Sequence, residues 1–276
     1  MGWIEAVVLG VVQGLTEFLP ISSSAHLRLV GELFGWDDPG AAFTAIIQIG
    51  TEAAVLLYFR KDIWRIVVAW LASLTGRRKG DPDARMGWLI IVGSIPIVVL
   101  GLLFQDDIET TLRDLRIVAI CLVGFSLILF WADRGGAKKR ELRDLTVGHG
   151  IGFGFAQAMA LIPGVSRSGG TITAGLFLGY SRAAAARYSF LLAIPAVLGS
   201  GFFQAYEALT GDVAGQGVAW GPTILATVIG FGVGLTVIAW LLRYLDRGSF
   251  LPFVVYRVVL GLLVLALVGA GVLSPT

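Results

Sequence analysis

Two stretches of the sequence place a helix-breaking proline and a run of polar residues inside apolar surroundings. They read QGLTEFLPISSSAH at residues 13–26 and QAMALIPGVSRSGGT at residues 157–171. The apolar segments around them, 1–35 and 147–180, are too interrupted to cross a bilayer as single helices. Broken helices survive at membrane depth only where protein or water satisfies the freed backbone groups. We therefore predict two re-entrant hairpins, each made of two half-length helices around a polar break.

The composition of the chain is that of a membrane protein. Hydrophobic residues make up 56% of the 276 residues and charged residues only 14%, against about 25% charged in soluble domains. The net charge of +2 and the scatter of basic residues through short loops give no indication of a nucleic-acid partner. Because Cys121 is the lone cysteine, the chain has no internal disulfide framework.

Six further segments are apolar for about 20 residues, which is the length that a bilayer-spanning helix needs. The sequence therefore predicts an all-α integral membrane protein, a single membrane domain over 1–276, with six transmembrane helices besides the two hairpins. The six predicted spans are 41–60, 86–104, 115–132, 184–206, 221–243 and 251–273.

The charges of the loops indicate an orientation. Basic residues are concentrated in the loops 60–85 and 133–146, whereas the loops on the opposite side carry mainly Asp and Glu. Short basic loops face the cytoplasm in most membrane proteins. With six spans, the first hairpin then enters from outside, the second enters from the cytoplasm, and the C-terminus lies outside.

The two halves of the sequence resemble each other weakly, because residues 13–24 parallel residues 157–168. Repeat one then covers about 1–132 and repeat two about 147–273, each with one hairpin and three spans. An odd number of spans inverts the second copy in the membrane. Broken helices of inverted repeats form polar sites near the bilayer midplane, so we predict that the two breaks meet.

Two acidic residues inside apolar segments, Glu17 and Glu52, are candidate metal ligands. Gln13 lies four residues before Glu17 and shares its helix face, as Gln48 does with Glu52. Carboxylate and amide oxygens suit Mg²⁺ or Ca²⁺ better than Zn²⁺, with water and phosphate completing the coordination. We predict a Mg²⁺ or Ca²⁺ site formed by Gln13, Glu17 and Glu52. The structural alternative is a carboxyl group that holds the break together or pairs with an arginine.

The serines after Pro20 and the histidine that follows them are the candidate nucleophile and base. A serine on this turn can simply cap the next half-helix. In the functional interpretation, Ser22 and Ser24 bind phosphate, Ser23 attacks phosphorus and His26 accepts its proton. Alternatively, His26 attacks phosphorus itself or protonates the leaving group, and the sequence does not separate these roles.

The second break, residues 163–171, has the features of an anion-binding loop. Its small residues, Gly164 among them, allow close approach of the backbone, and the helix that follows presents its N-terminus to phosphate. Arg167 offers a guanidinium fork that matches phosphate oxygens. The hydroxyl donors are Ser166, Ser168 and Thr171. No Walker-type lysine follows, so nucleotide binding is not indicated.

Together these groups are the ones that phosphoryl transfer requires: a divalent ion and an arginine to neutralise phosphate oxygens, and a positioned nucleophile. A site at membrane depth further indicates a substrate with a lipid tail. Two other classes of function stay open. A transporter or flippase of a lipid phosphate is typically built from inverted repeats with broken helices. A non-catalytic lipid-phosphate binder needs Arg167 but neither Glu17 nor His26.

At these residues the chain resembles the undecaprenyl-diphosphatases, the bacitracin-resistance protein family. The resemblance covers nearly the whole length and is strongest in 13–26 and 163–171, with weaker matches at 47–50 and 250–257. It implies hydrolysis of undecaprenyl diphosphate to undecaprenyl phosphate and inorganic phosphate, which recycles the lipid carrier for peptidoglycan and other envelope polymers and confers resistance to bacitracin. It also implies Mg²⁺ or Ca²⁺ dependence and a multi-pass protein of the bacterial cell (inner) membrane, with its site facing the extracytoplasmic side. The oligomeric state is left open, a homo-oligomer included.

The resemblance also assigns roles residue by residue. The family's acidic motif is Glu or Gln, three residues, then Glu, which corresponds here to Gln13 and Glu17. Its histidine corresponds to His26 and its motif arginine to Arg167. Gln13 makes the metal site less negative than a glutamate would. The assignment of Glu52 as a ligand rests on the argument from its intramembrane charge alone.

Overall fold

The regular structure of the protein is helical. The computed structural model describes residues 1–37, 40–77, 80–109, 111–210 and 218–274. Within these residues the only β-type pairing is an isolated bridge between Arg140 and Tyr180, so the all-α prediction is confirmed. Part of the loop-charge argument lies outside the described residues, because it used Asp38, Arg78, Lys79 and Asp212.

Five helices in the described part of the chain are long and apolar enough to cross a membrane by themselves. They are α5 (Pro82–Leu103), α7 (Leu115–Gly135), α10 (Arg182–Thr210), α11 (Trp220–Leu245) and α12 (Leu251–Gly269). A sixth candidate is a bent pair, α3 (Gly40–Tyr58) and α4 (Arg60–Leu74), which is bent by 82° at its break. Five of the six predicted spans therefore coincide with a candidate helix, and the sixth corresponds to α3.

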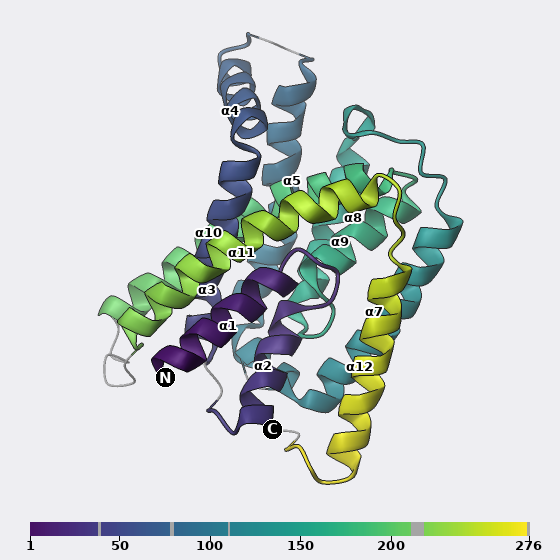
Figure 1. Ribbon diagram of the computed structural model, residues 1–276. Helices are drawn as coiled ribbons and strands as arrows, with labels where there is room; N and C mark the ends of the chain where they lie inside the picture. The colour runs from purple at the N-terminus through teal and green to yellow at the C-terminus, as the bar shows by residue number, and fades with distance from the viewer. Residues whose placement is uncertain (38–39, 78–79, 110, 211–217, 275–276) are drawn as a thin grey trace.

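The segment predicted as the basic loop 60–85 is mostly helical, which corrects the sequence interpretation. Its helix, α4, packs against α5, and the two form a hairpin that projects from the rest of the molecule (Figure 1). The charged residues in the first turn of α4 led to its interpretation as a loop, although apolar residues recur at helical spacing after them. Two of these residues, Ile66 and Ala69, are buried against the neighbouring helix.

Both broken segments have the predicted form of two short α-helices around a break in the α-helical backbone, and the second break begins with a 3₁₀ turn, Met159–Leu161. The first contains α1 (Trp3–Thr16) and α2 (Ser23–Phe34), and the second contains α8 (Val147–Ala158) and α9 (Arg167–Phe177). At about 1.5 Å per residue, none of the four is long enough to cross a bilayer alone. Each break ends on a serine with a left-handed backbone, Ser22 at φ 72° and Ser166 at φ 73°. This conformation is uncommon for residues other than glycine.

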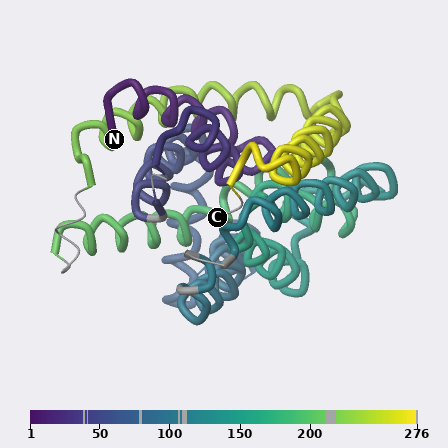
Figure 2. Tube along the Cα trace, turned by 90° about the horizontal axis from the view of Figure 1, so that it is seen from below, coloured from purple at the N-terminus to yellow at the C-terminus, as the bar shows by residue number. Residues whose placement is uncertain are grey.

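The halves of the chain pack across each other rather than separately. α1 packs along α11, α8 packs along α5, and α7 lies beside α12 in both views (Figures 1 and 2). Small residues permit the closest of these contacts. A methyl group on Gly10 would lie 2.7 Å from the carbonyl oxygen of Ala226, and one on Gly154 would lie 2.5 Å from that of Gly93. Larger side chains at these glycines would therefore push the helices apart.

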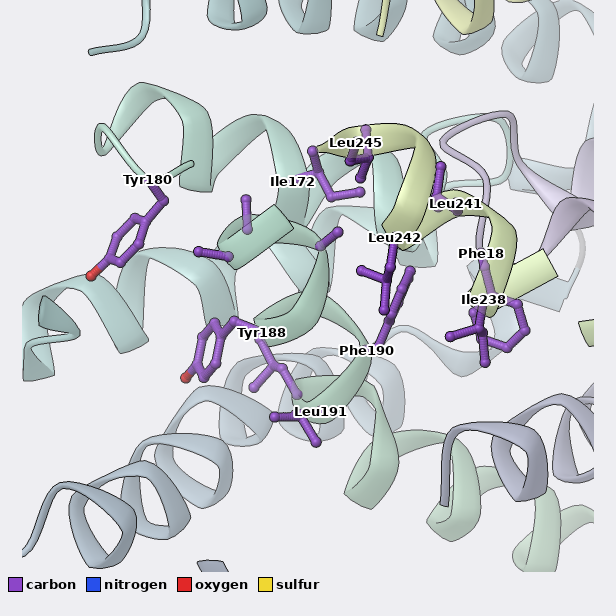
Figure 3. Close-up of a cluster of buried hydrophobic side chains, with 14 of the residues drawn as sticks. Phe18, Ile172, Tyr180, Tyr188, Phe190, Leu191, Ile238, Leu241, Leu242 and Leu245 are labelled. Atoms are coloured by element: carbon purple, nitrogen blue, oxygen red, sulfur yellow. The ribbon is translucent and has the colours of Figure 1, made fainter. Parts of the chain in front are cut away.

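The largest apolar cluster lies where α9, α10 and α11 meet (Figure 3). Phe190 of α10 meets Phe18 of the first break edge-on, with ring centroids 5.3 Å apart. Leu241 and Leu242 of α11 and Ile172 of α9 belong to the same cluster. The cluster anchors the neighbourhood of both breaks to the long helices, which fixes the positions of the polar residues between them.

Candidate active site

The two breaks lie against each other and are joined by side chains of the second one. Arg167, the first residue of α9, forms an ion pair with Glu17 at the end of α1. Ser168 donates a hydrogen bond to the carbonyl oxygen of Leu19 at 2.9 Å. The structure therefore brings together the two motifs that the sequence singled out.

Glu17 is the centre of the polar cluster, and its side chain is 5% exposed. Its Oε1 accepts from Arg167, while its Oε2 accepts from Gln13 Nε2 at 2.9 Å and from the Ser23 hydroxyl at 2.5 Å. Hydrogen bonds to an ionised carboxylate are short and strong. A carboxylate that already binds the hydroxyl proton of a serine is placed to accept that proton. The geometry thus gives Ser23 a carboxylate as its proton acceptor.

His26 does not bond to Ser23, which departs from the Ser–His pair considered from the sequence. Its Nδ1 lies 2.7 Å from the carbonyl oxygen of Ser22, one helical turn earlier, and its Nε2 lies 2.6 Å from the Tyr256 hydroxyl. A carbonyl oxygen can only accept, so Nδ1 carries the proton and Nε2 accepts from Tyr256. The rings of His26 and Tyr256 also stack, with centroids 5.6 Å apart. Both ring nitrogens are engaged, so His26 orients the first break, and its catalytic role stays a prediction.

Arg257 of α12 is a site residue to which the sequence assigned no role. It is fully buried. Its Nη1 donates to the carbonyl oxygen of Pro20 at 2.9 Å, and its Nη2 donates to those of Gly164 and Val165 at 2.8 and 3.1 Å. One guanidinium group thus satisfies carbonyls that both breaks leave free, as a broken helix requires at membrane depth. An arginine inside an apolar span is the sequence feature that marks Arg257 as a candidate site residue. No such feature marks the neighbouring Tyr256.

Half of the predicted phosphate-binding residues line the main cavity, namely Ser22, Ser24 and Ser166. The other half make contacts within the protein. Ser168 is bonded to the first break, and the buried Thr171 donates to the carbonyl oxygen of Arg167 at 2.7 Å. Gly164 has φ 95°, and a side chain there would meet the carbonyl oxygen of Val118 at 2.4 Å. These three residues hold the second break in place, and their role as phosphate ligands stays a prediction.

Both α2 and α9 begin at the cavity, with Ser23 and Arg167 as their first residues. The N-terminus of α9 is capped from within, because Ser166 Oγ accepts from the Gly169 N–H at 3.1 Å. At α2 the corresponding residue, Ser22, makes no such bond. The first turn of α2 therefore keeps N–H groups for an anion, which the helix dipole also favours.

A cavity of about 570 Å³ extends from this polar cluster. One end is lined by Glu17, Ser23 and Arg167, and apolar residues of α5 and α10 supply much of the remaining lining. Polar side chains also line it outside this cluster, namely Thr44, Gln48, Gln105, Arg113, Ser200 and Gln204. The volume is typical of sites that bind small molecules. A cavity with a charged cluster and a partly apolar remainder fits a ligand with an anionic head and an apolar tail.

The predicted metal ligands leave oxygen atoms without partners. Gln13 and Glu52 are almost fully buried, and the Oε1 atom of each has no hydrogen-bond partner. Glu52 interacts electrostatically with both Arg167 and Glu17. Unpaired buried oxygens of this kind indicate a bound cation or water. Among the described residues, no group of three or more His, Cys, Asp or Glu could hold a metal alone. Carboxylate and amide oxygens are ligands that suit Mg²⁺ or Ca²⁺, but Gln13 and Glu52 do not line the cavity, and the metal site stays a prediction.

These features define a class of protein: a multi-pass α-helical membrane protein with a polar cluster buried between two broken helices. Within this class, the chain belongs to the BacA family, described as bacitracin resistance protein BacA, which matches residues 6–263.

Curated relatives match the chain over its whole length. It is 62% identical to an undecaprenyl-diphosphatase of Kineococcus radiotolerans, covering 99% of this chain and 96% of the relative. It is 60% identical to an undecaprenyl-diphosphatase of Pseudarthrobacter chlorophenolicus, covering 99% and 100%. It is 58% identical to undecaprenyl-diphosphatase 2 of Streptomyces coelicolor, covering 100% and 98%.

Proposed function

We propose that this protein hydrolyses undecaprenyl diphosphate to undecaprenyl phosphate and inorganic phosphate. The observation that carries the proposal is the Ser23–Glu17–Arg167 cluster at the head of a cavity with many apolar lining residues from α5 and α10. The cluster supplies a hydroxyl nucleophile, a proton acceptor and a cation for phosphate oxygens. The names of the three relatives above give the same activity and substrate. The reaction returns the lipid carrier to the synthesis of peptidoglycan and other envelope polymers, and in doing so confers bacitracin resistance.

In the proposed reaction, the Ser23 hydroxyl oxygen attacks the terminal phosphorus while its proton passes to Glu17. The new O–P bond forms at Ser23 and the bond to the bridging oxygen breaks, so undecaprenyl phosphate leaves. Glu17 returns the proton to that oxygen. Water then cleaves the seryl phosphate in the same manner, giving one proton to Glu17, which passes it back to Ser23. Attack by His26 is less favoured, because Ser22 and Tyr256 hold its ring nitrogens.

Charge neutralisation is the second part of the mechanism. Arg167 is placed to bind the oxygens of the attacked phosphate, and a single such donor is worth about 10²–10³ in kcat. The open N-terminus of α2 offers backbone N–H groups to the same oxygens. Gln13, Glu17 and Glu52 would hold the Mg²⁺ or Ca²⁺ ion, which when bound supplies positive charge to the diphosphate.

The proposed setting is the bacterial cell (inner) membrane, with six spans, two re-entrant hairpins, and the site facing the extracytoplasmic side. One contact supports the assignment of both basic loops to a single side. Arg85, the last residue of the predicted first loop, donates to the carbonyl oxygen of Arg143 in the second at 2.7 Å. Basic loops on one side are expected to be cytoplasmic. We further infer that 1–276 forms one membrane domain, and a homo-oligomer is left open.

An inverted repeat, about 1–132 and about 147–273, is also part of the proposal. Gln13 and Gln157 are both fully buried, each nine residues before the left-handed serine of its break, Ser22 or Ser166. In each break that serine lies 3.2 Å, hydroxyl to hydroxyl, from the serine two residues on. The helix contacts agree with such a repeat. α1 of the first half packs against α11 of the second, and its counterpart in the second half, α8, packs against α5 of the first. Because transporters share this arrangement, transport of the lipid phosphate is the second candidate function.

The test is phosphate release from undecaprenyl diphosphate by the purified protein in detergent, with and without EDTA. We expect metal-dependent release that is lost in Glu17→Ala and in Arg167→Ala. Folding of each variant is checked by its thermal transition and its elution in size-exclusion chromatography. A well-folded wild-type protein that releases no phosphate would overturn the hydrolase and leave the transporter, which is then measured as lipid movement in vesicles.

A further inference from the structure

The cavity is too small for the whole substrate of the proposed function. A volume of about 570 Å³ lies within the range of sites that enclose a drug-sized ligand. A diphosphate with eleven isoprene units is far larger. The head group and the first isoprene units therefore fill the cavity, and the remaining chain must leave it through an opening that faces lipid.

The side chains that line the cavity show where this opening lies. Val98 and Leu102 of α5 and Phe203 of α10 line the cavity and are also 46%, 68% and 49% exposed. A side chain that is both lining and exposed stands at the edge of an opening. All three are apolar and belong to helices long enough to span a bilayer, so the opening between α5 and α10 faces acyl chains.

Two internal prolines, Pro96 of α5 and Pro195 of α10, lie where the cavity between these helices begins. Before Pro96 and Pro195 the helices touch: a methyl group on Gly93 would lie 2.8 Å from the side chain of Leu192, and Ser94 bonds to the Leu192 carbonyl oxygen at 3.4 Å. A proline within a helix removes a hydrogen bond and bends the helix. On α5 the first cavity-lining residue is the one after Pro96, and on α10 the first is Pro195 itself.

Gly199 lies on the cavity side of α10, after Pro195. It lines the cavity, and a methyl group built on it would meet no atom within 4 Å. A glycine in a helix interior is less favourable than alanine, and no close packing contact at this position requires it. The absence of a side chain at residue 199 leaves the cavity open toward the gap.

We propose that the α5–α10 opening is the path of the substrate's isoprenoid chain, and that Gly199 and Leu102 determine whether a long chain can bind. The proposal rests on the proposed function and deepens it. The diphosphate remains at the Ser23–Glu17–Arg167 cluster, while the first isoprene units lie along Gly199 and leave past Leu102 into the bilayer.

The first test fills the cavity with Gly199→Phe. Phosphate release by the wild-type protein is measured beforehand, so that failure of the proposed function is seen separately. For the variant we expect KM for undecaprenyl diphosphate to rise by about tenfold or more, because the ring occupies the space of an isoprene unit. The inhibition constant of inorganic pyrophosphate, a head group without a chain, should stay within about twofold. Gly232→Phe is the matched control, since Gly232 of α11 is also open to 4 Å but does not line the cavity.

The second test narrows the opening itself. Leu102 and Leu103 are adjacent and equally exposed, at 68% and 70%, but only Leu102 lines the cavity. Leu102→Trp should raise KM for the long substrate by about fivefold or more, and Leu103→Trp should not. An unchanged KM in both Gly199→Phe and Leu102→Trp would overturn the proposed path. A parallel rise in the pyrophosphate inhibition constant would also overturn it, because the substitutions would then act on the head-group site.

Discussion

Arg167 and Glu17 form an ion pair between the first residue of α9 and the end of α1, 150 positions apart in the sequence. The pair joins the two breaks and leaves Glu17 bonded to Ser23 as well. A buried charge that loses its partner is strongly destabilising, so each residue of the pair fixes the other. The same contact therefore serves the fold and the proposed chemistry.

Replacing Glu17 by glutamine separates these two contributions. Glu17→Gln retains the shape and a hydrogen-bond acceptor for Ser23 but removes the proton acceptor, so kcat for phosphate release should fall by about 10²–10⁴. The matched control is Asp133→Asn, which alters a second partly buried pair, Arg182 with Asp133 at 2.6 Å. That variant should lower the thermal transition without a comparable loss of kcat. If Glu17→Gln retained wild-type kcat, Glu17 could not be the base.

Removal of the Ser23 hydroxyl tests the choice of nucleophile. Ser23→Ala should reduce kcat by at least about 10², because the attacking oxygen is lost. Ser126→Ala, which removes a buried hydroxyl from α7, should leave kcat within about twofold. Full activity in Ser23→Ala together with an inactive His26→Gln would instead identify His26 as the attacking group.

Gln13 offers a direct test of the metal site. In Gln13→Glu the added carboxylate lies beside Glu17, to which Gln13 bonds at 2.9 Å, so the ion should bind more tightly. We expect the half-activating Mg²⁺ concentration to fall by about tenfold, which corresponds to about 1.4 kcal/mol. Gln157→Glu is the control, because Gln157 is equally buried in the other hairpin but is not a predicted ligand. A shift of the same size in both variants would contradict the assignment.

Arg257 should contribute mainly to stability and to the positions of the breaks. Arg257→Met leaves the carbonyl groups of Pro20, Gly164 and Val165 unpaired inside the protein. Unsatisfied buried groups cost about 1–3 kcal/mol each, so the thermal transition in detergent should fall strongly. Arg243→Met, at an exposed position of α11, provides the comparison. Restored phosphate release on addition of guanidinium to Arg257→Ala would show that the lost group acts by positioning, whereas a normal transition in Arg257→Met would contradict this role.

Acid stability should depend on Asp114, the residue just before α7. The hydrogen bond from the Arg116 side chain lowers the pKa of the Asp114 carboxyl group below its ordinary value of 3.8. A lowered pKa means that the ionised form stabilises the folded state above the pKa of the unfolded chain, and that this contribution is lost as the pH falls through the folded pKa. In Asp114→Asn the thermal transition should vary less than in the wild type below about pH 4. Asp107→Asn on α6 (Gln105–Glu109) is the control, and an unchanged wild-type pH profile in Asp114→Asn would refute the prediction.

The parts of the fold that follow from local sequence were predictable. Pro20 and Pro163 with their neighbouring serines located both breaks, and the weak similarity of the two halves led to the prediction that the breaks meet. The helix α4 was missed, because its charged first turn masks the apolar repeat behind it. The sequence of α4 alone does not show which other helix its apolar face will pack against.

The finer geometry of the site depends on contacts between distant residues, which one sequence does not encode in any readable pattern. His26 was paired with Ser23 because they are near in sequence, but the ring meets Tyr256, 230 positions away. Arg257 was recognisable as a buried charge, yet its partners are backbone carbonyl groups, and any residue type carries those. The residues of the polar cluster could therefore be named from the sequence, while their hydrogen-bond partners could not.

The position of Arg257 in the final helix has a consequence for biosynthesis. Apart from Tyr256, which bonds to His26, the rest of the site is translated before α12. Ribosomes therefore complete both breaks while three of their carbonyl groups still lack the guanidinium that will bind them. The arginine in turn has no partners in the bilayer until both breaks exist, and an isolated charge there is costly. Insertion of α12 and assembly of the site are thus a single late event. A nascent chain that ends before residue 257 would contain the residues of the polar cluster, but it would lack the arginine that holds the two breaks in position.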